Sequence, residues 1–265
     1  MTEACDTHIH VYDARSPAAP TATIHPPDAS LDDYAEVQAA LGTGRTVLVQ
    51  PTTYGLDNSL HLAAMAELGP ERARGVMVVD GSVDADTLRR LTDLGVRGAR
   101  MHLLPGGAID GAELEAVAAK VAPFGWHVQL QRNGHELAAD LDRLRRLPCP
   151  LVIDHVGRFM PPVEADDPAF AALLALVDDG AHVKLSAPYE SAPDATHRYD
   201  LVTAGIDALV ARAPDRLLWA SNWPHPAQAD PPTPADLGRL GARWLPTDAL
   251  RRQVLVDNPA ALYGF

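Results

Sequence analysis

The chain has 265 residues, of which 47% are hydrophobic and 22% charged, a balance typical of a compact globular protein and unlike that of a disordered chain. Its formal net charge of -13, without any dense Lys/Arg cluster, argues against nucleic acid as a partner. Cys5 and Cys149 show no paired spacing, no apolar run approaches the roughly 18 residues that span a bilayer, and no export signal opens the sequence, so we expect a reduced, cytoplasmic protein without membrane segments.

Short β-branched runs alternate with Ala/Leu-rich stretches of helical period along the chain. Strands are predicted over 5–12, 46–50, 73–79, 96–101, 126–131, 151–155, 182–186 and 217–221. Helices are predicted between them over 31–41, 59–68, 84–94, 113–121, 136–146, 170–177 and 201–211. Eight such units predict a (β/α)₈ TIM barrel, an α/β fold formed by residues 1–265 as a single domain. An open doubly wound sheet is the alternative, but no glycine-rich dinucleotide fingerprint follows the first strand.

Two proline-rich stretches are predicted to be loops at the catalytic face of the barrel. Residues 16–27 leave the end of the first strand, and residues 224–234 leave the end of the eighth. Beyond the second loop, residues 234–245 and 248–256 are predicted helices. We expect the C-terminal helices, about 234–263, to pack on the outside of the barrel.

The first strand carries a histidine pair, His8 and His10, whose spacing of two points both imidazoles to one face. Neutral imidazole is the commonest nitrogen ligand of Zn²⁺, so such a pair can hold one metal from two sides. The alternative is that one of the two is a hydrogen-bonded core histidine. The position on a first barrel strand favours the functional interpretation.

Two later strands end in polar residues at the expected catalytic face. His155 ends the sixth strand, and the strand period predicts that Asp154 faces the opposite way, in a buried polar or supporting role. Asn222 follows the eighth strand at the catalytic rim. His225, in the loop beyond it, enters the pocket or is solvated, and the sequence favours neither.

Further candidates for substrate binding follow from strand parity. Arg100 and His102 share a face of the fourth strand, and an arginine fork suits a carboxylate, the alternative being a salt-bridged strand end. Lys184 is interpreted as a structural residue of the seventh strand. The other polar candidates, on the lumen face or at the rim, are Gln129, Gln131, Thr52, Tyr54 and Tyr189.

Three motifs in barrel order resemble a known family. His8-Ile9-His10, Asp154-His155-Val156-Gly157 and Ser221-Asn222-Trp223-Pro224-His225-Pro226 are similar to the amidohydrolase superfamily branch that includes 2-pyrone-4,6-dicarboxylate lactonase. The segments 6–13, 49–58 and 184–190 look closer still to the D-galactarolactone isomerases of that branch. The resemblance implies a barrel that binds a small anionic lactone and exposes its ring carbonyl to a nucleophile.

One departure from the family pattern bears on the reaction. Lactone hydrolases of this branch carry an aspartate at the position of Asn222, where it acts as general base on water. Asparagine has no proton affinity near neutral pH, which favours attack by a hydroxyl of the substrate, as in conversion of D-galactaro-1,5-lactone to the 1,4-lactone. In this interpretation His8, His10, His155 and Asn222 are the catalytic residues.

The resemblance leaves other functions open. A lactone hydrolase of the pyrone-dicarboxylate type, a metal-dependent amidohydrolase or decarboxylase, and a non-catalytic barrel that binds sugar acids are the alternatives. Because the lactone-specific branch works without a metal requirement, we predict no cofactor, although His8, His10 and His155 could bind Zn²⁺. The sequence does not define the oligomeric state.

Overall fold

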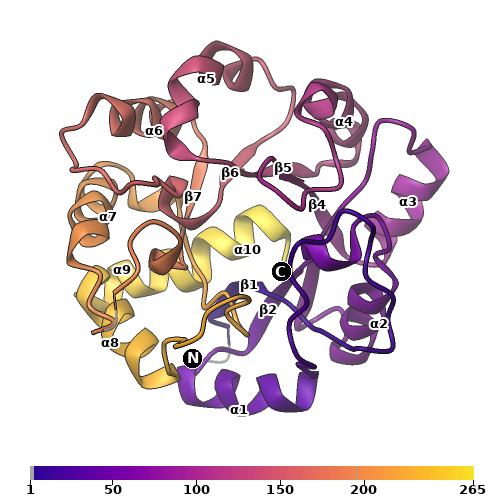
Figure 1. Ribbon diagram of the computed structural model, residues 1–265, viewed down its shortest axis with the longest axis horizontal. Helices are drawn as coiled ribbons and strands as arrows, with labels where there is room; N and C mark the ends of the chain where they lie inside the picture. The colour runs from indigo at the N-terminus through magenta and orange to yellow at the C-terminus, as the bar shows by residue number, and fades with distance from the viewer. Residues whose placement is uncertain (1–2, 195) are drawn as a thin grey trace.

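Eight parallel strands form one sheet in chain order, and the sheet curls into a barrel surrounded by helices (Figure 1). The computed structural model describes residues 3–194 and 196–265. The strands are β1 (Cys5–Ile9), β2 (Arg45–Val49), β3 (Ala73–Met77), β4 (Val96–His102), β5 (His127–Gln131), β6 (Leu151–Ile153), β7 (His182–Leu185) and β8 (Leu217–Trp219). The barrel closes where the chain beyond β8 returns to β1: the Asn222 amide donates to the His8 carbonyl at 3.0 Å, and the His10 amide donates to the Trp223 carbonyl at 2.9 Å. The predicted (β/α)₈ fold is confirmed.

Helices connect successive strands and cover the outside of the sheet. They are α1 (Leu31–Leu41), α2 (Ser59–Leu68), α3 (Ala85–Asp93), α4 (Leu114–Val121), α5 (Leu137–Arg145), α6 (Pro168–Asp178) and α7 (Asp200–Arg212). The ends of α1 show how local sequence sets these bounds: Ser30 and Asp33 form a capping box, and Gly42 ends the helix in the left-handed conformation. Within the described residues, no helix has the length and apolar character needed to cross a membrane.

The strands that carry site residues end earlier than the sequence predicts. β1 ends at Ile9 rather than residue 12, β6 at Ile153 rather than 155, and β8 at Trp219 rather than 221. Beyond β6 and β8 the backbone enters the left-handed region, at φ 53° for His155 and φ 62° for Asn222. Strand geometry cannot continue through such residues, so these side chains are aimed by turns and not by the period of two.

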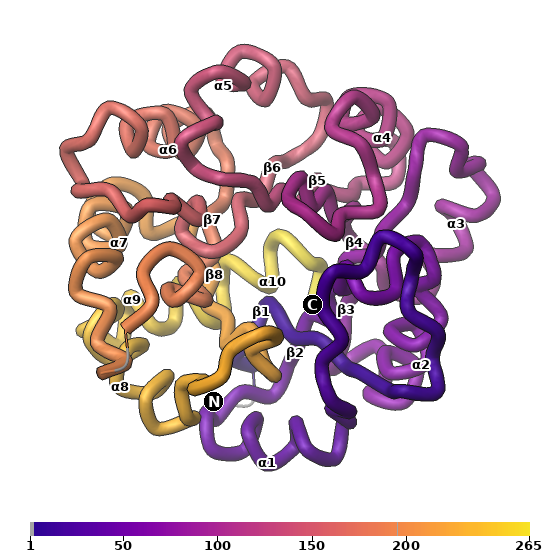
Figure 2. The backbone as a smooth tube through the Cα atoms, in the orientation of Figure 1, coloured from indigo at the N-terminus to yellow at the C-terminus, as the bar shows by residue number. Residues whose placement is uncertain are grey.

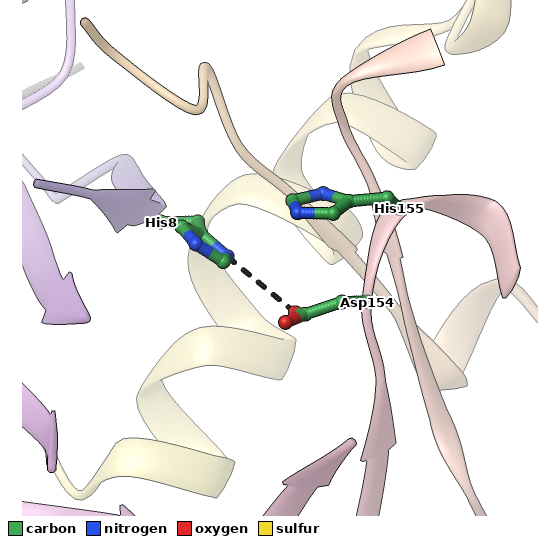
Figure 3. A group of neighbouring side chains, drawn as sticks. All are labelled: His8, Asp154 and His155. Atoms are coloured by element: carbon green, nitrogen blue, oxygen red, sulfur yellow. Dashed lines mark ion pairs between the residues drawn. The ribbon is translucent and has the colours of Figure 1, made fainter. Parts of the chain in front are cut away.

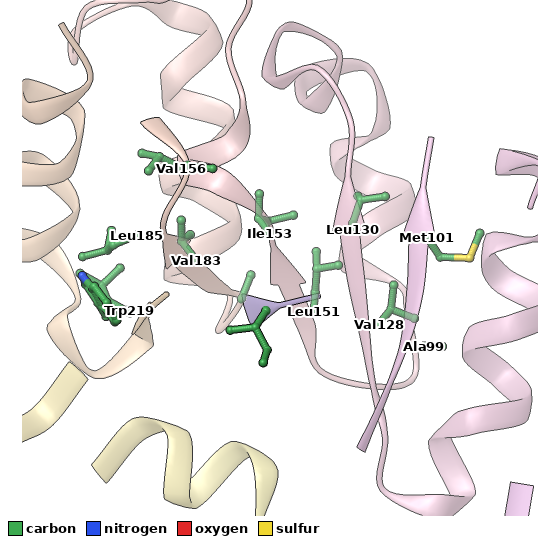
Figure 4. Packing of buried hydrophobic residues seen from close by; sticks show 14 of the residues in the cluster. Ala99, Met101, Val128, Leu130, Leu151, Ile153, Val156, Val183, Leu185 and Trp219 are labelled. Carbon is green, nitrogen blue, oxygen red and sulfur yellow. The ribbon is translucent and has the colours of Figure 1, made fainter. Parts of the chain in front are cut away.

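Two hydrophobic clusters hold the barrel. The larger fills the space between sheet and helices, where Ala99, Met101, Val128, Leu130 and Ile153 point outward (Figure 4). The smaller lies inside the barrel and contains Cys5, Val47, Val49, Val76, Val152, Leu218 and Tyr263. The alternation of outward and inward residues on each strand produces both clusters and leaves the carboxyl end of the lumen for polar side chains.

The C-terminal segment differs from the expected outer packing. It comprises α8 (Pro234–Trp244), α9 (Asp248–Arg252), the π-turn η8 (Gln253–Asp257) and α10 (Asn258–Tyr263). Although α8 packs against α1 and α7 on the outside, α10 lies inside the ring of outer helices (Figure 2). Tyr263, fully buried, joins the interior cluster and closes the amino-terminal end of the barrel. The difference arises because three apolar residues at the chain end, Leu262, Tyr263 and Phe265, seal the open bottom of the lumen.

Candidate active site

A bulge in β1 sets the direction of the first histidine. The pairing of β1 with β2 shifts register between Asp6 and Ile9, which breaks the simple alternation of faces. The buried Asp6 carboxylate accepts hydrogen bonds from the Ser221 amide at 2.9 Å and the His8 amide at 3.4 Å. Burial raises the pKa of Asp6 to about 6, although these hydrogen bonds oppose the shift. Asp6 therefore fixes the bulge and the exit of β8 together.

The histidine pair of β1 forms one hydrogen-bonded unit. His10 Nδ1 lies 2.7 Å from the Val49 carbonyl, which can only accept, so His10 carries its proton on Nδ1. Its Nε2 then accepts, and His8 Nε2, at 3.2 Å, must be the donor. Burial holds the pKa of both imidazoles well below the usual value, which keeps the pair neutral at pH 7.

A buried lysine supports the other side of this unit. Lys184 Nζ lies 2.7 Å from the Thr7 carbonyl, 2.7 Å from Gln129 Oε1 and 3.4 Å from His8 Nδ1, which occupies its three donors. Burial lowers the pKa of Lys184 to about 8, and the Asp154 carboxylate, 3.9 Å away, opposes this shift. Lys184 is thus more than the structural residue predicted, because its ammonium contacts a candidate catalytic histidine.

The prediction that Asp154 faces away from the lumen is wrong. Asp154 and His155 both project toward His8 (Figure 3), with Asp154 Oδ1 3.4 Å from His8 Nδ1. Both can do so because β6 ends at Ile153 and the turn η5 (His155–Gly157) rotates the following side chains. Asp154 Oδ2 also accepts a hydrogen bond from Gln129 at 3.1 Å. Burial alone would raise the pKa of Asp154, but the charges around it hold this pKa well below its usual range.

His155 lies above this layer and faces the cavity. Its Nδ1 is 2.8 Å from the hydroxyl of Ser186, which follows β7. A hydroxyl can donate or accept, so the Ser186 contact is compatible with a proton on either ring nitrogen of His155. Burial lowers the pKa of His155, opposed by the carboxylates of Asp154 and Glu190. His155 is therefore a neutral imidazole that can take up and release a proton.

Asn222 belongs to a chain of three polar side chains. Its Nδ2 donates to the Tyr189 hydroxyl at 2.8 Å, and that hydroxyl lies 3.0 Å from His225 Nδ1. Asn222 Oδ1 is buried and has no hydrogen-bond partner among the described residues. An unpaired acceptor at this depth is costly, and a ligand hydroxyl would satisfy it.

Arg100 is held at the wall of the lumen by three neighbours. Nη1 donates to the Gln50 carbonyl at 2.7 Å, Nη2 donates to Gln131 Oε1 at 2.7 Å, and Nε lies 4.0 Å from Asp154 Oδ2. Gln131 Oε1 is also 3.1 Å from His102 Nδ1. The guanidinium is thus oriented before any ligand arrives, which lowers the entropic cost of binding a carboxylate.

A cavity of about 450 Å³ opens at the carboxyl ends of the strands. It is lined by eight of the twelve predicted site residues: His10, Thr52, Arg100, His102, Gln131, His155, Tyr189 and Asn222. His8 and Gln129 lie outside this lining and are fully buried. His225 is also outside this lining; its amide donates to the Asn222 carbonyl at 2.8 Å, and its Nδ1 lies 3.0 Å from the Tyr189 hydroxyl.

Tyr54 does not occupy the rim position predicted for it. Its hydroxyl accepts a hydrogen bond from the Asp13 amide at 2.9 Å, and its ring packs beside Tyr12 and His61. The short turn η1 (Thr52–Tyr54) places Thr52 at the cavity and directs Tyr54 behind it. Tyr54 therefore anchors the loop that follows β1.

Sequence reasoning missed Arg158, which forms an ion pair in the lining. Arg158 Nε donates to Glu190 Oε2 at 2.8 Å, and both side chains line the cavity. Arg158 follows η5, and Glu190 ends the turn η6 (Pro188–Glu190) after β7. The position of Arg158, three residues after His155, was the available signal.

The side chains at the floor of the cavity, meaning those directly beneath its lining, carry donor atoms that fit a zinc ion. Ligand atoms of His8, Asp154 and His155 all lie within 4.8 Å of one another, so Asp154 joins two members of the predicted ligand set. Imidazole nitrogens and carboxylate oxygens are ordinary zinc donors. The Lys184 ammonium, 3.4 Å from His8, adds positive charge beside this group and opposes cation binding.

Comparison with known proteins agrees with this geometry. The family model described as amidohydrolase matches residues 5–265. The chain belongs to the amidohydrolase family. D-galactarolactone isomerase of Agrobacterium fabrum (strain C58) is 36% identical over 98% of this chain and 90% of its own length. 2-Pyrone-4,6-dicarboxylate hydrolase of Comamonas testosteroni is 33% identical over the same shares. An apo crystal structure from Agrobacterium tumefaciens superposes with a TM-score of 0.93 at 36% identity, over 99% of this chain and 96% of that one.

The resemblance seen in the sequence motifs is confirmed by this family membership. All three motif regions, at His8, His155 and Asn222, meet at the carboxyl end of the barrel. This is the end at which barrel enzymes of this architecture place their active sites.

Proposed function

We propose that this amidohydrolase isomerises a small acidic sugar lactone, of the type D-galactaro-1,5-lactone to 1,4-lactone. The observation that carries the proposal is Asn222: its side chain lies at the cavity, its Nδ2 is held by Tyr189, and its Oδ1 is unpaired. An amide there can orient a hydroxyl but cannot deprotonate water. The similarity to a D-galactarolactone isomerase supports the same reaction.

The proposed step needs no water. A hydroxyl of the substrate attacks the ring carbonyl carbon, the new C–O bond forms, and the original ring C–O bond breaks. The proton of the attacking hydroxyl passes to His155 and then to the departing ring oxygen. Intramolecular attack has a high effective molarity, so positioning contributes much of the acceleration.

The lining residues divide this work by their chemistry. In the bound substrate Asn222 Oδ1 accepts a hydrogen bond from the hydroxyl that will attack. As this hydroxyl attacks, its proton turns from Asn222 to the neutral His155, which is backed by Ser186. Arg100 binds the substrate carboxylate, a charge-assisted contact that fixes the ring over His155. His8 and His10 hold the floor beneath the ring carbonyl.

Turnover is proposed to proceed without a metal. A zinc ion held by His8, Asp154 and His155 would polarise the ring carbonyl as a Lewis acid. Lys184 already supplies a positive charge next to His8 and Asp154. Elemental analysis and assay after chelator treatment test this point, since a stoichiometric metal whose removal abolishes turnover would refute it.

Lactone hydrolysis is the second candidate, because a relative 33% identical over nearly the whole chain is a lactone hydrolase. NMR of purified protein with freshly prepared D-galactaro-1,5-lactone separates the two. Appearance of the 1,4-lactone above the uncatalysed rate supports isomerisation, whereas the open acid would mean that another group activates water. If neither product forms faster than in the uncatalysed reaction, turnover of this lactone is refuted.

The variant Asn222→Asp sharpens this test. An aspartate at this position supplies the base that asparagine lacks, so the ratio of open acid to 1,4-lactone should rise by about tenfold or more. Asn222→Ala, which removes the amide without adding a base, is the matched control. An unchanged product ratio in Asn222→Asp would contradict the role given to this residue.

A further inference from the structure

The cavity lining carries few formal charges. Among the described lining residues, Arg100 and Arg158 are the basic side chains besides histidine, and Glu190 is the acidic one. Burial lowers the pKa of the lining histidines, to about 3 for His102, so they contribute no charge at pH 7. Two cations and one anion leave the lining with one net positive charge. Beneath it, the Lys184 and Asp154 charges offset each other at 3.9 Å.

The ion pair formed by Arg158 and Glu190 lies in the cavity wall, where its charges can change the affinity for a charged ligand. Its two side chains are only 18% and 22% exposed, so solvent screens this pair less than it screens a surface ion pair. The Nη groups of Arg158 make no hydrogen bond to any described residue, so they remain as donors. Glu190 and His155 line the same cavity, so a ligand at His155 lies within the field of the Glu190 charge.

We propose that Glu190 determines which lactones the site accepts: by pairing with Arg158 it leaves one unmatched cation, and the site therefore selects lactones with a single carboxylate. This inference rests on the proposed function and names its substrate class. The second carboxylate of a ligand with two would have to displace Glu190 from Arg158 or bind next to the negative charge of Glu190. Either event penalises the dianion, which is selection by repulsion as well as by attraction.

A binding experiment tests this preference for a single carboxylate, here called the charge rule, without requiring turnover. D-galactonate and D-galactarate are matched polyols with one and two carboxylates, and isothermal titration calorimetry of the intact protein measures both affinities. The wild type should bind galactonate more tightly than galactarate. Glu190→Gln, which removes the charge and keeps the shape, should shift the affinity ratio toward galactarate by about tenfold, the size expected for one charge-assisted contact.

Two further variants separate charge from structure. Arg158→Met combined with Glu190→Gln restores one net positive charge, so preference for galactonate should return. If the pair were purely structural, Glu190→Gln and the double variant would both bind each of the two ligands more weakly. The ratio of the two affinities would then stay unchanged. Glu115→Gln is the control: Glu115 on α4 pairs with Arg143 on α5 outside the cavity lining, so loss of its charge should change the ratio less than about twofold.

The outcomes are distinct from those of the lactone assay. A ratio in Glu190→Gln within about twofold of the wild type, or a wild type that prefers galactarate or binds neither anion, overturns the inference. Charge selection by a protein that converts no lactone would overturn the proposed function and leave the charge rule standing. Urea unfolding of each variant verifies that the compared proteins are folded.

Discussion

The two halves of the barrel lumen differ in the kind of side chain that fills them. The amino-terminal half is mainly apolar: Val47, Val76, Val152 and Leu218 pack against Tyr263, and the ring of the buried His127 lies beside it. The carboxyl-terminal half is equally buried but polar, with histidines, Lys184 and Asp154 in mutual contact. In the lower half each side chain contributes by its own removal from water. In the upper half each group depends on its partners, because an unpaired buried charge is unfavourable.

The lower half of the lumen therefore contributes mainly to stability, and the upper half contributes to both stability and chemistry. Loss of an apolar residue should weaken the fold and leave the reaction unchanged, whereas loss of a polar residue should affect both. The polar layer also responds to pH.

Acidification should break the polar layer as a whole. Burial lowers the pKa of His102 to about 3 and that of His225 to about 4, and it also lowers to about 3 the pKa of His61, which lies on α2 next to this layer. These groups are neutral in the fold but protonate near pH 6.5 when unfolded, so their stabilisation is full above 6.5 and is lost as pH falls toward 4. Each costs about 1.4 kcal/mol per pH unit below 6.5. Asp6, with a pKa raised to about 6, has the opposite sign but is a single group.

Urea unfolding midpoints between pH 7.5 and 5 measure this loss. The midpoint should begin to fall near pH 6.5, and one that stays constant to pH 5 would contradict the neutral buried histidines. His61→Gln provides a check, because a side chain that cannot titrate should reduce the slope with pH.

Removal of Lys184 should have the next largest effect. Lys184→Met keeps the stem but leaves Asp154 without its ammonium partner, and removal of one member of a buried pair costs about 3–5 kcal/mol. The free energy of unfolding from urea titration at pH 7 measures it. Lys120→Met is the matched control, since Lys120 lies on α4 and only donates to the Val83 carbonyl, a contact of about 1 kcal/mol. A loss below about 1 kcal/mol in Lys184→Met would show that Arg100 alone balances Asp154.

The lower half is tested by Tyr263→Ala. Truncation of this fully buried ring should cost about 3 kcal/mol through lost burial and the cavity left behind. Because Tyr263 lies at the opposite end of the lumen from the cavity, kcat/KM per folded molecule should stay within about twofold of the wild type. A large fall in kcat/KM with little loss of stability would reverse the assignment of the two halves.

Most of the fold follows from sequence periodicity. The bounds of α1 and α2 agree with prediction, and at α1 the capping box of Ser30 and Asp33 and the left-handed Gly42 mark the two ends. The closing role of α10 could not be predicted, since a short apolar chain end carries no sign of which surface it covers. The early ends of β6 and β8 were also hidden, because left-handed residues such as His155 and Asn222 are not marked by glycine.

The same cause limited prediction of the site. Residues within regular strands, such as Arg100 and His102 on β4, were placed correctly by the period of two. Asp154 was placed on the wrong side because the period was carried one residue beyond the true end of β6. Arg158 was missed because it lies on a turn, where no periodicity applies.

The smallest of the four effects is expected for Arg100→Ala. Loss of a charge-assisted carboxylate contact should raise KM by about tenfold, equivalent to about 1.4 kcal/mol, with a smaller change in kcat. Arg97→Ala is the control, because Arg97 lies on the same strand but bonds the carbonyls of Thr92 and Val96 outside the cavity. Arg100 also faces Asp154 at 4.0 Å, so urea unfolding must accompany the kinetics. An unchanged KM with reduced stability would make Arg100 a partner of Asp154 alone, and the upper layer would then bind substrate through Arg158.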